Sequence, residues 1–254
     1  MTIKKLIALT LLIFSFVIIP KICYAAITAA SVTSGQNTTD ATSFATASVT
    51  PGSNKLQLLA VMNRFSSTPP TTPTVTGNGL TWVQVNTIVT AVGEAYDNRR
   101  VTVFRAMGAA PSAGTITIDF GGNTQLSCAW SLIEFDGVNT GGTNGSSAVV
   151  QSVLTSTTAG NATSQTITLA AFASANNMAH GVALHWSNEA TTVGVDFTEV
   201  HDITITEGTM GFQTQYKLND TTVDTSWATN TRHSGIAIEI AEAAATTRRV
   251  FTTT

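Results

Sequence analysis

Cysteine and charge are both scarce in this chain. Only two cysteines occur among 254 residues, and charged residues make up 11% of the sequence. Cys23 lies in a segment that we expect to be removed, which leaves Cys128 alone and excludes a disulfide within the chain. We expect Cys128, in "LSCAWSLIEF", to be a buried and inert thiol. The fold must then be held by its core and its strand ladders.

Long apolar runs are confined to the N-terminus. Lys4 and Lys5 precede "LIALTLLIFSFVIIP", and Cys23 and Ala25 supply small residues at the −3 and −1 positions of a cleavage site. This layout predicts a Sec signal peptide over residues 1–25. A retained membrane anchor is the alternative, but the run is shorter than the roughly 20 residues that span a bilayer. We expect a mature chain without a membrane span, which is secreted, periplasmic or held at the cell surface.

Positive charge is also sparse. The expected leader contains three lysines, so nine of the 12 basic residues would remain against 15 acidic ones. A surface that binds phosphates needs clustered lysine and arginine, and the mature sequence offers only the pairs Arg99-Arg100 and Arg248-Arg249. We therefore expect no nucleic-acid partner.

A helical period is missing throughout the mature chain. No run has the 3.6-residue apolar spacing that a helix of a dozen residues needs, whereas Val, Ile and Thr recur in short alternating runs. Turn residues separate these runs about every ten positions. The pattern predicts an all-β, antiparallel two-sheet β-sandwich of roughly a dozen strands, of jelly-roll type. We expect this domain to span residues 26–241, with a flexible tail over 242–254.

The strand signals include "KLQLLAVMN", "GNGLTWVQVNTIV", "RRVTVFRAM", "GTITIDF", "MAHGVALHWSN", "TMGFQTQYKL" and "HSGIAIEIA". One of them, "LSCAWSLIEFDGV", is apolar at both odd and even positions. Such a run is typical of a central strand that is covered on both faces.

Several of these segments together resemble a known domain. "NKLQLLAVMNR", "GNGLTWVQVNT", "RRVTVFRAMGAAPSAGTITIDF", "LSCAWSLIEFDGVNT" and "HSGIAIEIA" are similar to successive strands of a recurring jelly-roll-like domain of bacterial secreted and phage-associated proteins. The resemblance covers about residues 56–240. It implies a fold and an extracellular setting, without an established activity and without functional residues to carry over.

Catalytic motifs are not evident. The chain has no G-x-S-x-G elbow, and His201 and Asp202 are neighbours that a strand would turn to opposite faces. Glycosidase chemistry needs two nearby carboxyl groups, for which Glu134, Glu239, Asp119 and Asp136 are the candidates. We favour the view that each of these acids is a solvent-facing or edge position. No catalytic residue is assigned, and an enzyme is the less favoured class.

Metal-binding patterns are absent as well. His180 and His185 are five residues apart, so on a strand they face opposite sides, and His233 stands alone. We expect no cofactor or resident metal. The loop "DGVNTGGTNG", with Asn139 and Asn144, is an alternative calcium site, but an ordinary polar turn is favoured.

The composition suits a ligand-binding function better than a catalytic one. Saccharides stack on flat aromatic faces, and amides and carboxylates beside the ring bind their hydroxyls. Candidate binding residues occur in three places along the sequence: Trp82; Tyr96 and Asp97; and Trp186, Asn188 and Glu189.

We therefore expect a secreted, non-catalytic β-sandwich module that binds a glycan or another extracellular partner through its end loops, in adhesion or surface display. One alternative is a structural or assembly subunit, such as a phage-like fibre or surface-layer component, in which the chain would form homo-oligomers. A second alternative is a secreted glycan-active enzyme with a carboxylate pair.

Overall fold

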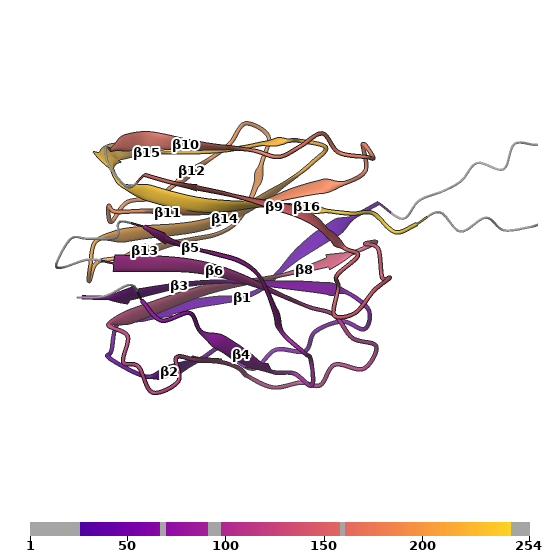
Figure 1. Ribbon diagram of the computed structural model, residues 1–254, viewed down its shortest axis with the longest axis horizontal. Helices are drawn as coiled ribbons and strands as arrows, with labels where there is room; N and C mark the ends of the chain where they lie inside the picture. The colour runs from indigo at the N-terminus through magenta and orange to yellow at the C-terminus, as the bar shows by residue number, and fades with distance from the viewer. Residues whose placement is uncertain (1–25, 67–69, 91–97, 158–160, 245–254) are drawn as a thin grey trace, which may run out of the picture. The chain divides into compact units, whose positions relative to one another are not determined.

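The computed structural model describes residues 26–66, 70–90, 98–157 and 161–244 (Figure 1). These residues form sixteen strands and no helix, so the all-β prediction is confirmed. All the strands belong to one compact unit, Tyr24–Ala244. The expected leader, residues 1–25, lies outside the described residues.

The strands divide into two halves of eight. The first half contains β1 (Thr28–Asn37), β2 (Ser43–Ala45), β3 (Leu56–Phe65), β4 (Thr74–Gly77), β5 (Val83–Thr90), β6 (Asn98–Ala106), β7 (Ile116–Asp119) and β8 (Ser127–Asp136). The second half contains β9 (Val149–Ser156), β10 (Ala162–Thr168), β11 (Met178–His185), β12 (Thr192–Val193), β13 (Thr198–Ile205), β14 (Met210–Leu218), β15 (Thr222–Thr231) and β16 (His233–Ile240).

These strands pair into four antiparallel sheets rather than the two that the sequence suggested. The first half forms a five-stranded sheet of order β1-β8-β3-β6-β5 and a three-stranded sheet of order β2-β7-β4. The second half forms a five-stranded sheet of order β9-β16-β11-β14-β13 and a three-stranded sheet of order β10-β15-β12. Figure 1 shows the two five-stranded sheets as the inner layers and the three-stranded sheets as the outer layers.

The two halves are structural repeats of each other. Adding eight to each strand number of the first half reproduces the strand order of both sheets of the second half. The pairing of individual residues is also equivalent in the two halves. Glu134 on β8 lies opposite Gln57 on β3, and Glu239 on β16 lies opposite Ala179 on β11. Asp119 precedes Glu134 by the same spacing as Asp224 precedes Glu239. The described part of the chain therefore forms a tandem pair of eight-strand repeats.

Three apolar clusters fill the spaces between the four sheets. The largest lies between the five-stranded sheets and includes Leu58 and Met62 from β3 and Val182 and Leu184 from β11. Because inner strands are covered on both faces, every residue of β11 and β16 is buried, and β8 is buried except at its end. The prediction of a central strand at "LSCAWSLIEF" is confirmed, because β8 lies between β1 and β3. Cys128 is buried and free.

The outer cores of the two repeats differ in chemistry. The first repeat packs large apolar side chains, including Phe104 and Trp130, between its sheets. By register, the equivalent positions in the second repeat carry Gln215 and Gly235. A Cβ atom on Gly235 would lie 2.5 Å from Gln165 Nε2, so the second repeat closes its sheets tightly around polar side chains. Its interior is smaller and more polar than that of the first repeat.

Matching polar contacts join the repeats at the edges of their inner sheets. Edge strand β1 contacts β13, and edge strand β5 contacts β9. In the first contact Ser31 Oγ lies 2.7 Å from His201 Nε2, and in the second Asn86 Nδ2 donates to Ser152 Oγ at 2.8 Å. Ser31 and Ser152 occupy equivalent positions, opposite Ile133 and Ile238. We call these two contacts the β1–β13 seam and the β5–β9 seam.

The end of the described chain is fastened to the body. Glu242 N donates to Asn177 Oδ1 at 3.1 Å, and Ala243 N donates to Gly137 O at 2.8 Å. The first residues of the expected tail are therefore bonded, while residues 245–254 lie outside the described part. Within the described ranges there is no helix long and apolar enough to cross a membrane.

Comparison of the two repeats reveals a residue in the central core that lowers the stability of the fold. His180 is 1% exposed, neither ring nitrogen makes a hydrogen bond of ordinary geometry, and the ring contacts Phe135 edge-on at 5.8 Å. Burial lowers the pKa of His180 to about 4, although the Gln215 backbone acts weakly in the opposite direction. The equivalent residue of the first repeat is Leu58, which is fully buried.

We predict that His180→Leu stabilises the protein. Removing buried nitrogens without partners should raise the free energy of unfolding at pH 7 by about 1 kcal/mol. Because its folded pKa is depressed, the wild-type histidine costs stability as pH falls from 6.5 towards 4, so the gain should grow by about 2 kcal/mol at pH 5. Urea unfolding at the two pH values measures both effects. A destabilised variant would contradict this account of the core.

Candidate functional site

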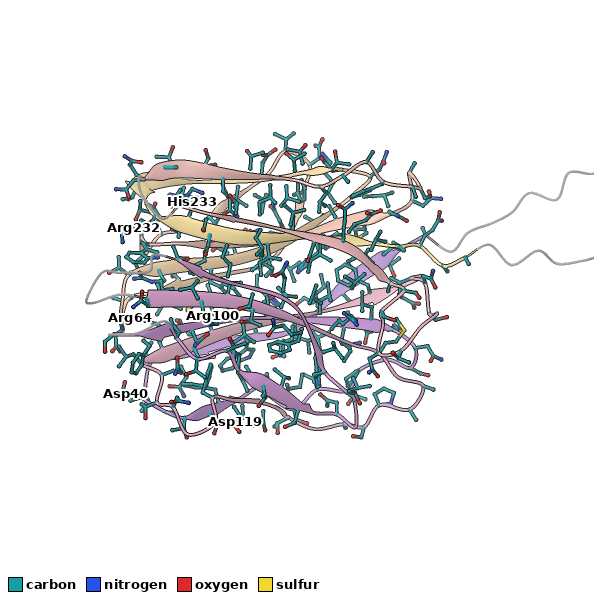
Figure 2. The ribbon with its side chains drawn as sticks, in the orientation of Figure 1. Asp40, Arg64, Arg100, Asp119, Arg232 and His233 are labelled. Carbon is teal, nitrogen blue, oxygen red and sulfur yellow. The ribbon has the colours of Figure 1, made fainter. Side chains whose placement is uncertain are left out.

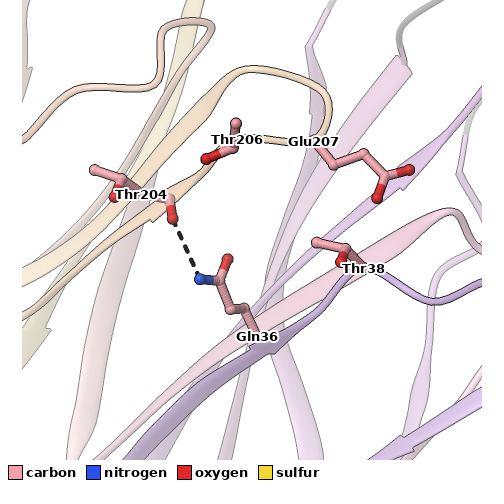
Figure 3. Close-up of a pocket in the computed structure, with 5 residues that line it drawn as sticks. All are labelled: Gln36, Thr38, Thr204, Thr206 and Glu207. Atoms are coloured by element: carbon pink, nitrogen blue, oxygen red, sulfur yellow. Dashed lines mark hydrogen bonds between the residues drawn. The ribbon is translucent and has the colours of Figure 1, made fainter.

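A hollow at the junction of the two repeats is the best candidate for a binding site. It has a volume of about 490 Å³ and is lined by Gln36, Thr38, Thr204, Thr206 and Glu207. The first two residues come from the end of β1 and just after it, and the other three from the end of β13 and the turn that follows. In Figure 3 Gln36 reaches towards the Thr204 carbonyl, to which its Nε2 donates at 3.3 Å, and Glu207 and Thr38 lie on the other side of the hollow.

The turn between β13 and β14 shapes this hollow. Gly208 has a φ of +84°, a conformation that glycine adopts without strain, and a Cβ there would lie 2.7 Å from Arg64 Nε. Arg99 donates a hydrogen bond to the carbonyl of Gly208. Asn188 Nδ2 donates to Thr206 Oγ1 at 3.2 Å. The turn is thus held by hydrogen bonds from two other segments, and Arg64 lies close against it.

An arginine–tryptophan stack lies behind the turn. The guanidinium of Arg99 is 3.9 Å from the centre of the Trp186 ring, and that of Arg232 is 5.1 Å from it. Arg99 is 1% exposed, so this cation–π contact is desolvated and strong. Arg64 lies opposite Arg99 in the β3–β6 ladder, and Figure 2 shows Arg64 and Arg232 at the same end of the unit. We call the hollow together with Trp186 and Asn188 the end surface.

The structure brings some of the predicted binding residues together and separates others. Trp186 and Asn188 both contribute to the end surface. Glu189 serves its own loop, since Oε1 accepts bonds from Thr229 N at 2.7 Å and Ser187 Oγ at 2.8 Å. The Thr229 N–H in particular lowers the pKa of Glu189.

Trp82 is not part of this surface. Trp82 precedes β5, whereas Arg99 pairs with Thr90 at the far end of that strand, so the two tryptophans belong to opposite ends of the sheet. The Trp82 ring packs on the core of the first repeat and donates to Gly77 O at 3.3 Å. Tyr96 and Asp97 lie outside the described residues.

The residues that line the hollow could not be found from the sequence. Gln36 and Thr38 are far from Thr204, Thr206 and Glu207 in the chain, and none of them belongs to a motif. The β1–β13 contact alone unites them. A useful signal would have been the internal repeat, because it predicts which strand edges face each other.

His185 lies at the centre of a buried polar chain beneath the loop between β11 and β12. Its Nδ1 lies 2.9 Å from Ser187 Oγ, which donates to Glu189, and its Nε2 lies 2.9 Å from Thr191 Oγ1. Because the Ser187 hydroxyl donates its hydrogen bond to the Glu189 carboxylate, it must accept a hydrogen bond from His185 Nδ1–H. Burial lowers the pKa of His185 to about 4, so the ring is neutral at pH 7.

The hydrogen-bonded side chains around His185 hold a loop in place, and an equivalent set in the first repeat does the same. The residue equivalent to His185 is Asn63, which donates to Thr71 O at 3.0 Å and to Gln125 Oε1 at 2.7 Å. Both side chains are buried and hold the segment that follows their strand. His185 is therefore an anchor of the end surface rather than a reacting group.

The histidines and acidic loops do not converge on a metal site. His180 faces Phe135 in the central core and His185 stacks on Trp227 in the outer core, so the prediction of opposite faces is confirmed. In the loop considered for calcium, Asp136 Oδ1 accepts from Gly137 N and Asn139 Oδ1 accepts from Gly141 N. Across the described ranges, no three His, Cys, Asp or Glu residues are grouped for an ion.

Glu134 and Glu239 are anchors at equivalent positions of the two repeats. Glu134 is partly buried and Glu239 is fully buried, so the expectation of a solvent-facing or edge position is wrong for Glu239. Glu134 accepts hydrogen bonds from Gly52 N at 2.6 Å and Gln57 Nε2 at 2.7 Å, and Lys55 Nζ lies 3.0 Å away. Burial would raise the pKa of Glu134, but these donors outweigh it and hold the pKa below its usual value.

In the second repeat, Glu239 accepts from Gln151 Nε2 and Asn177 Nδ2, both at 2.6 Å. Gly52 and Lys55 precede β3, just as Asn177 precedes β11. Each carboxylate therefore ties the last strand of its repeat to the turn before the third strand. The two lie in different sheets and both oxygens of each are occupied, an arrangement that suits fastening rather than a shared catalytic pair.

Comparison of the chain with protein-family models, with curated proteins and with solved structures found no match.

We predict that Glu134→Gln and Glu239→Gln each lower the free energy of unfolding by about 2 kcal/mol, because an amide cannot accept from all the donors that face the carboxylate. The folded pKa of Glu134 is depressed, so its stabilisation is complete above pH 4.5 and lost as pH falls below that value. Urea unfolding between pH 7 and 3 should show a flatter acid limb for Glu134→Gln.

Asp136→Asn is the matched control for Glu134→Gln. Asp136 also faces Lys55, at 3.5 Å, but its side chain is 60% exposed, so its loss should change stability by less than about 0.5 kcal/mol. Equal effects of Asp136→Asn and Glu134→Gln would refute the anchoring role.

Proposed function

We propose that the chain is an exported binding module that recognises a hydroxyl-rich ligand, a glycan or a glycosylated surface, through the end surface. The observation that carries this proposal is the polar hollow between β1 and the β13–β14 turn. Its volume lies within the range of small-ligand sites. It is also formed by both repeats, so a ligand there would contact the whole unit rather than one loop.

The chemistry of the lining favours sugars over charged or apolar ligands. Three threonine hydroxyls can donate and accept, the Gln36 amide can do both, and Glu207 accepts from hydroxyl donors. No lining residue is apolar or cationic. An apolar ligand would leave these groups without partners, and a phosphate would meet Glu207 with no cation in the lining to offset it.

Trp186 supports this surface rather than serving as a stacking platform. Arg99 covers its ring at 3.9 Å, and a pyranose cannot occupy the same face. Recognition would then depend on hydrogen bonds from the hollow and from Asn188. Such a site discriminates by hydroxyl geometry, because each unmatched polar group carries a desolvation cost.

We also propose that each repeat is a jelly roll. In support, the sheet orders β1-β8-β3-β6 and β2-β7-β4 recur as β9-β16-β11-β14 and β10-β15-β12. Eight antiparallel strands in two facing sheets are typical of that fold. The fifth strand of each repeat, β5 or β13, extends the inner sheet. The resemblance to bacterial secreted and phage-associated domains and the Sec-like leader support export.

A subunit of an assembly is the second candidate, favoured by the edge strand β9. Val150 and Leu154 on this strand are 54% and 38% exposed, and β9 pairs with β16 on one side only. Exposed aliphatic side chains on an unpaired edge favour contact with another chain. If this candidate holds, light scattering should show oligomers that Leu154→Lys dissociates; a wild-type monomer at high concentration would exclude it.

For the glycan-binding proposal, we predict that the wild type is retained by a subset of neutral oligosaccharides on an array. Glu207→Gln and Gln36→Ala should each weaken retention about tenfold or more, the worth of one hydrogen bond involving a charged or well-placed polar group. Trp186→Ala should also weaken it by loosening the turn.

Glu199→Gln is the matched control, since Glu199 is an exposed carboxylate on β13 outside the lining. It makes the same change in charge and should leave retention unaltered. The proposal fails if the wild type is retained by no glycan, or if Glu207→Gln and Glu199→Gln behave alike.

A further inference from the structure

The two seams have equivalent backbones and different chemistry. In the β5–β9 seam the equivalent of His201 is Asn86, because Asn86 lies opposite Val103 just as His201 lies opposite Thr214. Both positions follow a bulge in their strand. A serine meets each of them, Ser152 for Asn86 and Ser31 for His201. An amide and a hydroxyl are therefore enough to join the repeats at this position.

The β1–β13 seam carries two further polar residues that joining does not require. Ser131 Oγ lies 2.7 Å from His201 Nδ1 and 2.7 Å from Thr214 Oγ1. The equivalents of Ser131 and Thr214 are Ile236 and Val103, both apolar and fully buried. Ser131 is 1% exposed and Thr214 is fully buried, so hydroxyls have replaced aliphatic groups inside the core. Burying a hydroxyl costs stability unless it is hydrogen-bonded, and here Ser131 and Thr214 bond to each other and Ser131 bonds to His201, so these side chains are built as one hydrogen-bonded unit.

These four side chains form a line from the core to the surface: Thr214, Ser131, His201 and Ser31. Ser31 is exposed, whereas His201 is half-buried. A hydroxyl within hydrogen-bond distance of an imidazole, with a third group on the other ring nitrogen, is the arrangement of an activated nucleophile.

We propose that Ser31 is a nucleophile for acyl transfer, with His201 as its general base and Ser131 as a positioning residue. In this arrangement His201 Nδ1–H donates to Ser131, which donates to Thr214, and His201 Nε2 accepts the proton of Ser31. This activity goes beyond ligand binding at the hollow. Gln36 is five residues from Ser31, about 16 Å along an extended strand, so the two sites are separate.

The substrate class is an ester, which is hydrolysed in two steps. Ser31 Oγ forms a bond to the carbonyl carbon, His201 takes the hydroxyl proton, and the alkoxide leaves with that proton as the alcohol. Water then attacks the acyl-serine with His201 again as base, which releases the acid and restores Ser31.

Three observations support the assignment. Burial lowers the pKa of His201, so its ring is neutral and able to accept a proton at pH 7. The groups that face the ring are the hydroxyls of Ser31 and Ser131, while the neighbouring Asp202 turns away and accepts from Thr191 N. Val32, which follows Ser31, is skipped by the β1–β8 register, and a bulge of this kind leaves backbone groups outside the ladder.

The experiment treats the chain with p-nitrophenyl acetate and with a fluorophosphonate, followed by intact mass and peptide mapping. The wild type should carry one adduct on Ser31, and the acetate should show a burst of one equivalent. His201→Asn, which copies the β5–β9 seam and should keep the fold, is expected to lower the labelling rate about 100-fold, the typical contribution of a general base. The wild-type rate should fall in acid as the ring becomes protonated.

Ser152→Ala is the matched control, since Ser152 is the equivalent hydroxyl bonded to an amide that cannot act as base. Its labelling should equal that of the wild type, and Ser31→Ala should abolish it. An unlabelled wild type, an adduct elsewhere, or full labelling of His201→Asn would each overturn the proposal.

The role of Ser131 is tested by a pair of variants. Ser131→Ala removes the hydroxyl that orients the ring and should lower the labelling rate at Ser31. Ser131→Thr keeps the hydroxyl, and its extra methyl occupies a position where the other repeat accommodates Ile236, so it should restore labelling. Equal labelling of the two variants would refute a positioning role.

Discussion

The apolar contact between the two five-stranded sheets is the constraint on which the rest of the unit depends. It buries side chains from strands of both sheets, and residues such as Leu58 and Ile238 are fully buried within it. Burying an aliphatic side chain contributes about 1.5–3 kcal/mol, so this core is the main contact that holds the repeats together. Because the sheets face each other across it, the edges of one sheet must lie beside the edges of the other. The polar features of the unit then collect along those edges.

The seams and the end surface follow from that arrangement. Where β1 and β13 run side by side, the chain can bring together groups that are distant in sequence, as it does with Ser31 and His201. Farther along the same two strands, Gln36 bonds to Thr204 and the hollow opens beyond them. The buried anchors Asn63 and His185 hold the segments that follow β3 and β11, and the second of these supplies Trp186 and Asn188. The site is thus positioned by the core and shaped by the loops.

The sequence predicts the inner strands of the sheets better than the edge strands. Inner strands such as β8 and β16 are covered on both faces and read as apolar runs, and they were identified correctly. The strands β1 and β9 were not identified, although they occupy equivalent edges of the inner sheets. Their sequences, "TAASVTSGQN" and "VVQSVLTS", are polar because one side of each strand meets water. Without them neither the seams nor the hollow could be expected, since both depend on β1.

Comparison of equivalent positions in the two repeats distinguishes residues that the fold requires from residues that it does not require. Positions that are apolar in both halves, such as Ile133 and Ile238, satisfy the central core whatever the function. Glu134 and Glu239 are likewise the same acid in the same structural role. Where the halves differ, one half carries a polar residue at a position that is apolar in the other. His180 and Thr214 are such residues in the second repeat, and Ser131 is one in the first. A fold that needed only stability would have kept the apolar version in both halves. The polar residues of the β1–β13 seam therefore carry more functional information than the acids and aromatics that attract attention in the sequence.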